Sequence, residues 1–199
     1  MPTQNPLTSP KGTLLFGAIQ NPSTKFNELG EYVAVMVFSD EETQKLIQTL
    51  ETNLEAFRQS KGISPNVRKN IPYKKVIDQN GQETGQISFK FGNKAQIIRD
   101  GKDPIIIRPV IFDEAGRPYD VAIGSGSELK VSYTYNYWSN SGLGYGVSLR
   151  LKAVQVLNLK EPQSLQMDAQ YFGFTSEGDE DEENSAQCAQ KAEEEAVSF

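Results

Sequence analysis

Apolar and polar residues alternate most regularly between residues 128 and 159. From Leu129 to Tyr137, apolar and aromatic side chains occupy every second position, and this period of two is typical of a strand with one buried face. A glycine-rich turn, SNSGLGYG, separates this segment from a second alternating segment that begins at about Tyr145. The pattern predicts a long antiparallel hairpin. The alternation slips after Lys152, which predicts either a bulge in the second strand or a passage into a strand that is covered on both sides.

The rest of the pattern predicts further strands and a single helix. A capping-box pair, Ser39 and Glu42, precedes apolar residues at helical spacing, so we expect one amphipathic helix over residues 40–59. Pro109 confines one apolar segment to an edge or a bulge. The continuously apolar segment 32–38 predicts a strand that is buried on both faces. The other expected strand segments are residues 13–19, 86–91, 95–99 and 105–112.

About seven short strands and one helix indicate an all-β scaffold of the barrel type. Strand aromatics are usually buried, so we expect Tyr133 and Tyr135 in the core, together with Phe89 and Phe91. The alternative, in which these rings form a stacking platform, stays open at this point. Three proline residues in the first eleven predict an extended N-terminal arm.

Composition removes several classes of site. The 199 residues contain no histidine and one cysteine, which excludes histidine-based catalysis, imidazole metal sites and an internal disulfide. We expect no metal, no cofactor and no membrane span. The single cysteine is typical of a reducing cytoplasm.

Charge is distributed unevenly along the chain. Residues 177–199 contain nine acidic residues and one lysine, a net charge of −8, whereas the 19 basic and 17 acidic residues before them leave +2. Such a segment has few apolar residues with which to offset the entropy of ordering. We therefore expect a body over residues 1–175 and a disordered acidic tail over 176–199.

Cations and aromatic residues share the predicted hairpin, a combination that suits a single-stranded nucleic acid, because phosphates meet the cations and bases stack on the rings. Trp138, Tyr137 and Tyr145 lie close to its turn. A second basic stretch, residues 61–77, contains five cations and no acid; it tracks a phosphate backbone or is a solvated loop. The predicted DNA-binding residues are Lys130, Arg150, Lys152, Trp138, Tyr137, Tyr145, Arg68, Lys69, Tyr73, Lys74, Lys75 and Lys90.

The tail carries two carboxylate blocks and ends in an aromatic residue. The blocks can imitate a run of phosphates and compete for a cationic groove, while a terminal phenylalanine gives a partner a hydrophobic anchor. A purely solubilising tail is the alternative. The predicted partner-binding residues are Asp179, Glu180, Asp181, Glu182, Glu183, Glu193, Glu194, Glu195 and Phe199.

The hairpin GSGSELKVSYTYNYW…GVSLRLKAVQVLNL, the β-rich body with one early helix and the acidic tail ending in phenylalanine resemble the single-stranded DNA-binding proteins of short-tailed lytic, T7-like bacteriophages. The resemblance implies an oligonucleotide/oligosaccharide-binding (OB) barrel of five strands with extra strands. It also implies a homodimer that coats single strands during replication, recombination and repair in the cytoplasm of the infected bacterium. Its tail would contact the phage DNA polymerase and the primase-helicase. This tail is longer than the family pattern and is interrupted by NSAQCAQKA.

Two functions from other classes remain as alternatives. A structural or assembly protein of a phage particle would also have a β-rich body, with tyrosines at subunit contacts. A nuclease would need scattered aspartates to converge in three dimensions, because no spaced carboxylate cluster precedes the tail. We expect a protein that is not an enzyme.

Overall fold

The computed structural model describes residues 5–25, 27–78 and 80–162. This part of the chain forms one compact unit that ends at Pro162. Its elements, in chain order, are β1 (Leu7–Thr8), β2 (Gly12–Ser23), β3 (Glu31–Val37), α1 (Asp40–Ser60), β4 (Lys69–Asn70), β5 (Tyr73–Ile77), β6 (Glu83–Lys94), β7 (Gln96–Arg99), β8 (Lys102–Ile106), β9 (Val110–Phe112), β10 (Glu128–Asn140) and β11 (Gly144–Asn158).

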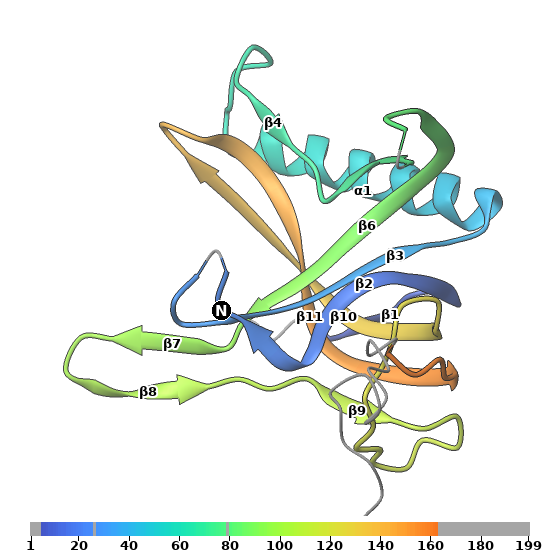
Figure 1. Ribbon diagram of the computed structural model, residues 1–199. Coiled ribbons are helices and arrows are strands. Elements are labelled where there is room, and N and C mark those ends of the chain that lie inside the picture. Colours follow the sequence, from blue (N-terminus) through green and yellow to red (C-terminus); the bar gives the residue numbers. More distant parts are fainter. Residues whose placement is uncertain (1–4, 26, 79, 163–199) are drawn as a thin grey trace, which may run out of the picture. The chain divides into compact units, whose positions relative to one another are not determined.

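Five long strands close a barrel in the order β10-β2-β3-β6-β11, because β10 and β11 also pair with each other. The described residues thus confirm the all-β barrel with one helix. The strands are more numerous than expected, and β2 and β6 are longer than expected (Figure 1). β7 and β8 form a separate two-stranded ribbon. Pro109 lies between β8 and β9, so the single segment expected over 105–112 is two strands.

The predicted hairpin is present, with β10 and β11 paired from Glu128↔Asn158 to Asn140↔Gly144. A register shift between Ser132 and Tyr133 faces Lys152, which confirms the bulge. On either side of it, Leu151 and Val154 both point into the barrel and are 1 % exposed. The bulge therefore keeps the inner face apolar along the whole of β11.

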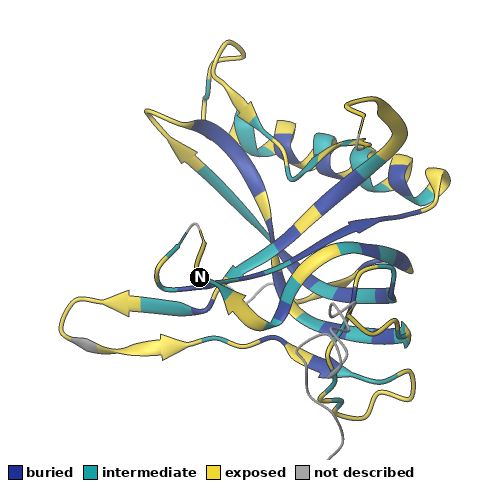
Figure 2. Cartoon of the chain, in the orientation of Figure 1, coloured by how far each residue is buried: buried dark blue, intermediate teal, exposed yellow. Residues whose placement is uncertain are grey.

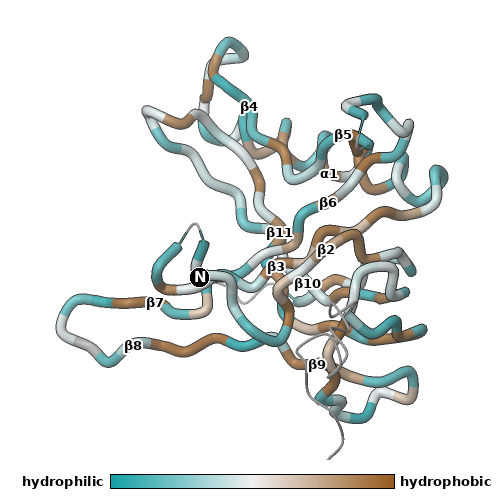
Figure 3. The backbone as a smooth tube through the Cα atoms, in the orientation of Figure 1, coloured by the Kyte–Doolittle hydropathy of each residue, from teal (hydrophilic) through white to brown (hydrophobic). Residues whose placement is uncertain are grey.

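The core fills the barrel and confirms most of the burial expectations (Figure 2). Phe89, Phe91 and Tyr133 are buried, and the rings of Phe91 and Tyr133 meet edge to face at 5.2 Å. Tyr135 is half-buried and touches Tyr133, with 5.6 Å between the ring centroids. In Figure 3, hydrophobic segments run through the central strands. These rings are thus packing residues of the core.

The helix begins and ends close to the predicted positions. Leu50 and Leu54 join the core, and Phe57 stacks on Tyr137 of β10 with ring centroids 5.3 Å apart. Ser39 is the N-cap residue, but its side chain makes no capping hydrogen bond, so the predicted capping box does not form. Three acidic residues in the first turn complement the helix dipole instead. No described helix has the length and apolar character needed to cross a membrane.

The tip of the hairpin is anchored to the basic stretch by a close backbone contact. Gly144 has a φ of 93°, and a Cβ placed on it would overlap the Arg68 carbonyl oxygen. The Tyr145 N–H donates to the same oxygen at 3.0 Å. Only glycine fits this position, both for its backbone angle and for the space it leaves.

We expect Gly144→Ala to lower the free energy of unfolding by about 1–3 kcal/mol. The added methyl group would push the Arg68 backbone away, and residue 144 has a positive φ that alanine avoids. Urea denaturation measures the change. Gly142→Ala is the matched control in the same turn, since its nearest atom is Asn140 Oδ1 at 3.5 Å. Equal stability of the two variants would contradict this account of the tip.

Candidate nucleic-acid interface

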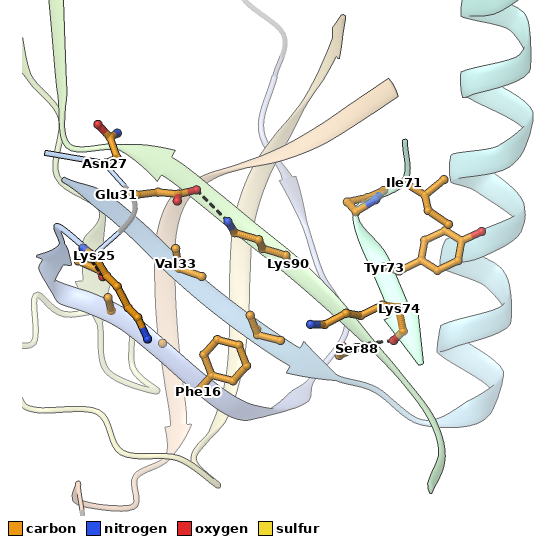
Figure 4. A pocket seen from close by; sticks show the side chains of 15 residues that line it. Phe16, Lys25, Asn27, Glu31, Val33, Ile71, Tyr73, Lys74, Ser88 and Lys90 are labelled. Atoms are coloured by element: carbon orange, nitrogen blue, oxygen red, sulfur yellow. Dashed lines mark hydrogen bonds and ion pairs between the residues drawn. The ribbon is translucent and has the colours of Figure 1, made fainter. Parts of the chain in front are cut away.

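A groove of about 660 Å³ lies on the outer face of β2, β3, β5 and β6 (Figure 4). The strand register brings residues of its floor together. Phe16 pairs with Val35, Val35 pairs with Lys90, and Lys74 pairs with Ser88. Residues that pair directly across strands share a face. The groove is lined by Phe16, Gly17, Ala18, Ser23, Lys25, Asn27, Glu31, Val33, Val35, Ile71, Pro72, Tyr73, Lys74, Ser88 and Lys90.

An exposed aromatic ring stands in this groove. Leu14 points inward and is 1 % exposed, whereas Phe16 points outward and is 54 % exposed. A register shift between Leu14 and Phe16 causes the difference, since strict alternation would place both side chains on one face. Single exposed apolar residues are common on protein surfaces, but Phe16 lines one groove together with Val33 and Val35. An apolar patch with a polar rim is typical of a ligand-binding groove.

Lys25, Lys74 and Lys90 surround the apolar floor. The Lys90 ammonium is 3.1 Å from a Glu31 carboxylate oxygen. The Lys74 side chain extends over the groove (Figure 4), and within the described residues its ammonium has neither an ion pair nor a hydrogen bond. Flat apolar surface beside cations is the arrangement that binds bases and phosphates together.

Tyr73 lines the groove but directs its hydroxyl toward the helix. The hydroxyl donates to Glu51 of α1 at 2.7 Å, and Lys69 pairs with the same carboxylate. Burial and this hydrogen bond raise the pKa of Tyr73. Burial alone would raise the pKa of Glu51, but hydrogen bonds from Lys69 and Tyr73 outweigh it and lower that pKa. The cluster of Glu51, Lys69 and Tyr73 fastens the groove wall to α1.

The predicted DNA-binding residues occupy four places. Tyr73, Lys74 and Lys90 line the groove. Lys130, Trp138, Arg150 and Lys152 lie on the outer face of β10 and β11. Tyr137 and Tyr145 lie on its inner face. Lys69 lies on β4, Arg68 directly precedes it, and Lys75 lies on β5.

Trp138 is half-buried at the tip of the hairpin. Its Nε1 donates to Ser148 Oγ at 3.2 Å, and its ring lies against Gly146, where a Cβ would be 2.9 Å from a ring atom. The indole therefore keeps part of its surface open on the same face as Arg150. This placement is compatible with the predicted stacking role.

The two predicted tyrosines do not offer open rings. Tyr145 is 4 % exposed, and Tyr137 already stacks on Phe57. Burial and the charge of Tyr135 raise the pKa of Tyr137 to about 12. Both are thus packing residues in this structure, which does not fit the stacking role expected for them.

Two lysines of the basic stretch form ion pairs. Lys69 pairs with Glu51, and Lys75 with Glu83 at 2.7 Å. Such exposed pairs are weak, so they leave the lysines able to exchange partners. The predicted tail residues lie outside the described part of the chain. In the described residues, no group of three or more histidine, cysteine or acidic side chains could hold a metal ion.

The groove contains residues that the sequence pattern did not indicate. Phe16 looked like an ordinary strand residue, because its outward position depends on the register shift after Leu14. Lys25 lies in a loop with no distinctive composition. The one feature of this segment that the sequence offers is that Gly17 interrupts the apolar run directly after Phe16.

Comparison with known proteins gives the fold. No protein-family model matches the sequence, and no curated protein is significantly similar to it. The crystal structure of gp2.5, a single-stranded DNA-binding protein of bacteriophage T7, superposes with a TM-score of 0.63 and 23 % identity, over 88 % of this chain and 98 % of that one. This chain has the fold of gp2.5.

A second phage protein has the same fold. The single-stranded DNA-binding protein of bacteriophage Enc34, solved in complex with single-stranded DNA, superposes with a TM-score of 0.57 and 10 % identity, over 80 % of this chain and 90 % of that one. A C-terminal truncation of the Enc34 protein also gives 0.57, at 10 % identity, over 79 % and 88 % of the two chains.

We expect Glu51→Gln to lower the free energy of unfolding by roughly 0.5–1.5 kcal/mol at neutral pH, the value of a hydrogen bond to a carboxylate at a partly exposed site. The folded pKa of Glu51 is lowered, so its contribution is complete above the ordinary value of 4.5 and fades as pH falls through the folded value. Urea unfolding at a series of pH values should therefore show the gap between variant and wild type closing in acid.

Glu41→Gln is the control for this prediction. Glu41 lies on the same helix and pairs with Lys45, but its side chain is 77 % exposed, so we expect a smaller loss. A gap for Glu51→Gln that widened as pH falls would contradict the role given to the carboxylate.

Proposed function

We propose that the protein is a sequence-tolerant, non-catalytic single-stranded DNA-binding protein of a bacteriophage. The observation that carries the proposal is the exposed Phe16, which stands on an apolar floor of Val33 and Val35 between three lysines. The fold shared with two phage proteins that bind single-stranded DNA supports it.

The groove suits a single strand better than a duplex. A base of a single strand can leave its stack and lie on Phe16, and every base has a face that an aromatic ring accepts. The ammonium groups of Lys25, Lys74 and Lys90 neutralise the phosphates. Release of condensed counterions then makes binding sensitive to salt, without dependence on base sequence.

We propose the outer face of the β10–β11 hairpin as a second contact region. Lys130, Arg150 and Lys152 would extend the phosphate path, and Trp138 would stack on a base. The basic residues Arg68, Lys69 and Lys75 would contribute charge between this region and the groove. These assignments rest on placement and charge.

We further propose that the acidic tail, residues 176–199, competes with DNA for the cationic surface and recruits replication proteins. In this view the 1–175 body coats single strands during replication, recombination and repair in the cytoplasm of the infected host. Homodimerisation and contacts with the phage DNA polymerase and primase-helicase belong to the same proposal. Its support is the charge of −8 carried by residues 177–199 beside a body of +2.

Phe16→Ala should weaken binding of a labelled oligo-dT strand by about 1–3 kcal/mol, the value of stacking one base. Fluorescence anisotropy measures the dissociation constant. Ile106→Ala is the control, because Ile106 is 67 % exposed but lies on the β7–β8 ribbon. Equal affinities of wild type and Phe16→Ala would place the bases elsewhere.

Removing residues 176–199 should tighten binding of oligo-dT at low salt, and the gain should shrink as salt screens the tail. The same anisotropy assay at 50 mM and 300 mM salt tests this. A scrambled tail of the same composition should restore the weaker binding. Unchanged affinity at low salt after removal would show that the tail does not occupy the binding surface.

A further inference from the structure

Glu31 places a carboxylate inside a groove that we propose to bind phosphates. It begins β3 and lines the groove together with Lys25, Lys74 and Lys90. Its carboxylate oxygen lies 3.1 Å from the Lys90 ammonium (Figure 4). A negative charge at this position opposes a polyanion, so its presence needs a reason.

Stability does not supply that reason. The Lys90 side chain is 54 % exposed and that of Glu31 31 % exposed. Water can therefore solvate the lysine without a partner, and pairs of this kind add little to the free energy of folding.

The fold makes room for this carboxylate. A Cβ placed on Gly92, two residues after Lys90 in β6, would lie 2.9 Å from Glu31 Oε1. All other atoms near that Cβ are at ordinary contact distances, the nearest being the Tyr32 carbonyl oxygen at 3.5 Å. The glycine thus leaves the space in which the carboxylate reaches Lys90.

We propose that Glu31 is an internal competitor for the phosphate site on Lys90. In the free protein the Glu31 carboxylate pairs with the Lys90 ammonium, and a phosphate of a bound strand must displace the carboxylate. The pair therefore lowers the affinity of the groove and makes release of the strand easier. This inference rests on the proposed function and adds the regulation of that site.

Two single variants disturb the pair in different ways. Glu31→Gln removes the charge and keeps the size of the side chain. Gly92→Ala keeps the charge but pushes the carboxylate aside, and because the end of a glutamate side chain is flexible and Gly92 does not require a positive φ, the variant should fold. A circular dichroism melting curve checks that each variant is folded.

The experiment measures affinity for a labelled 20-nucleotide oligo-dT at a series of salt concentrations, with the full chain. Each variant should bind roughly two- to fivefold more tightly than wild type at low salt, the equivalent of an exposed ion pair. The dependence of log affinity on log salt should steepen by up to about 0.7, since one more lysine is available to a phosphate.

Two controls separate this mechanism from a general effect of charge. Glu41→Gln removes a carboxylate that is paired with Lys45 at 2.7 Å on α1, outside both the groove and the hairpin, and it should leave affinity nearly unchanged. In a Lys90→Ala background, Glu31→Gln should no longer tighten binding, because its target is absent.

The outcomes are distinct. If wild type binds oligo-dT but Glu31→Gln binds no more tightly, the inference is overturned and the proposed function stands. Tightening by Glu31→Gln that persists without Lys90, or that Gly92→Ala does not reproduce, also overturns it, since the carboxylate then acts by repulsion at a distance. Failure of wild type to bind single strands would defeat the proposed function itself.

Discussion

Each wall of the barrel must keep one face apolar and one face wet, and the closure of β10 on β11 imposes this on all five strands. In a strand the faces alternate strictly, so any change of face requires an extra residue in the ladder. Two register shifts provide such changes. One keeps β11 apolar inside beyond Lys152, and the other turns Phe16 outward on β2.

The consequence for function is a division between inner and outer aromatic residues. Phe89, Phe91 and Tyr133 fill the core, and Tyr137 connects the hairpin to Phe57 of the helix. Phe16 and Trp138 lie on the outer face, where lysine and arginine residues accompany them. The lysines of the groove also differ in their pairing. The Lys90 ammonium pairs with Glu31, whereas the Lys74 ammonium has no partner among the described residues.

Sequence reasoning found the elements that follow from periodicity. The hairpin, its bulge, the helix and the burial of Phe89 and Phe91 all follow from side-chain alternation or helical spacing, which are local properties. The outward turn of Phe16 and the assembly of the groove could not be predicted, because they depend on pairing between strands distant in sequence. The tyrosines at 137 and 145 show the same limit. Proximity to a turn suggested exposure, whereas Tyr137 is half-buried and stacks on Phe57 of α1, and Tyr145 is buried in the core.

The central claim is that single strands bind the groove through its lysines. The most direct test compares two triple alanine variants, one at Lys25, Lys74 and Lys90 and the other at Lys130, Arg150 and Lys152, by the salt dependence of oligo-dT affinity. We predict that the groove variant loses the larger part of the affinity and that its log–log slope falls by up to about 2, at about 0.7 for each lost phosphate contact. Wild-type affinity and slope in the groove variant would contradict the account.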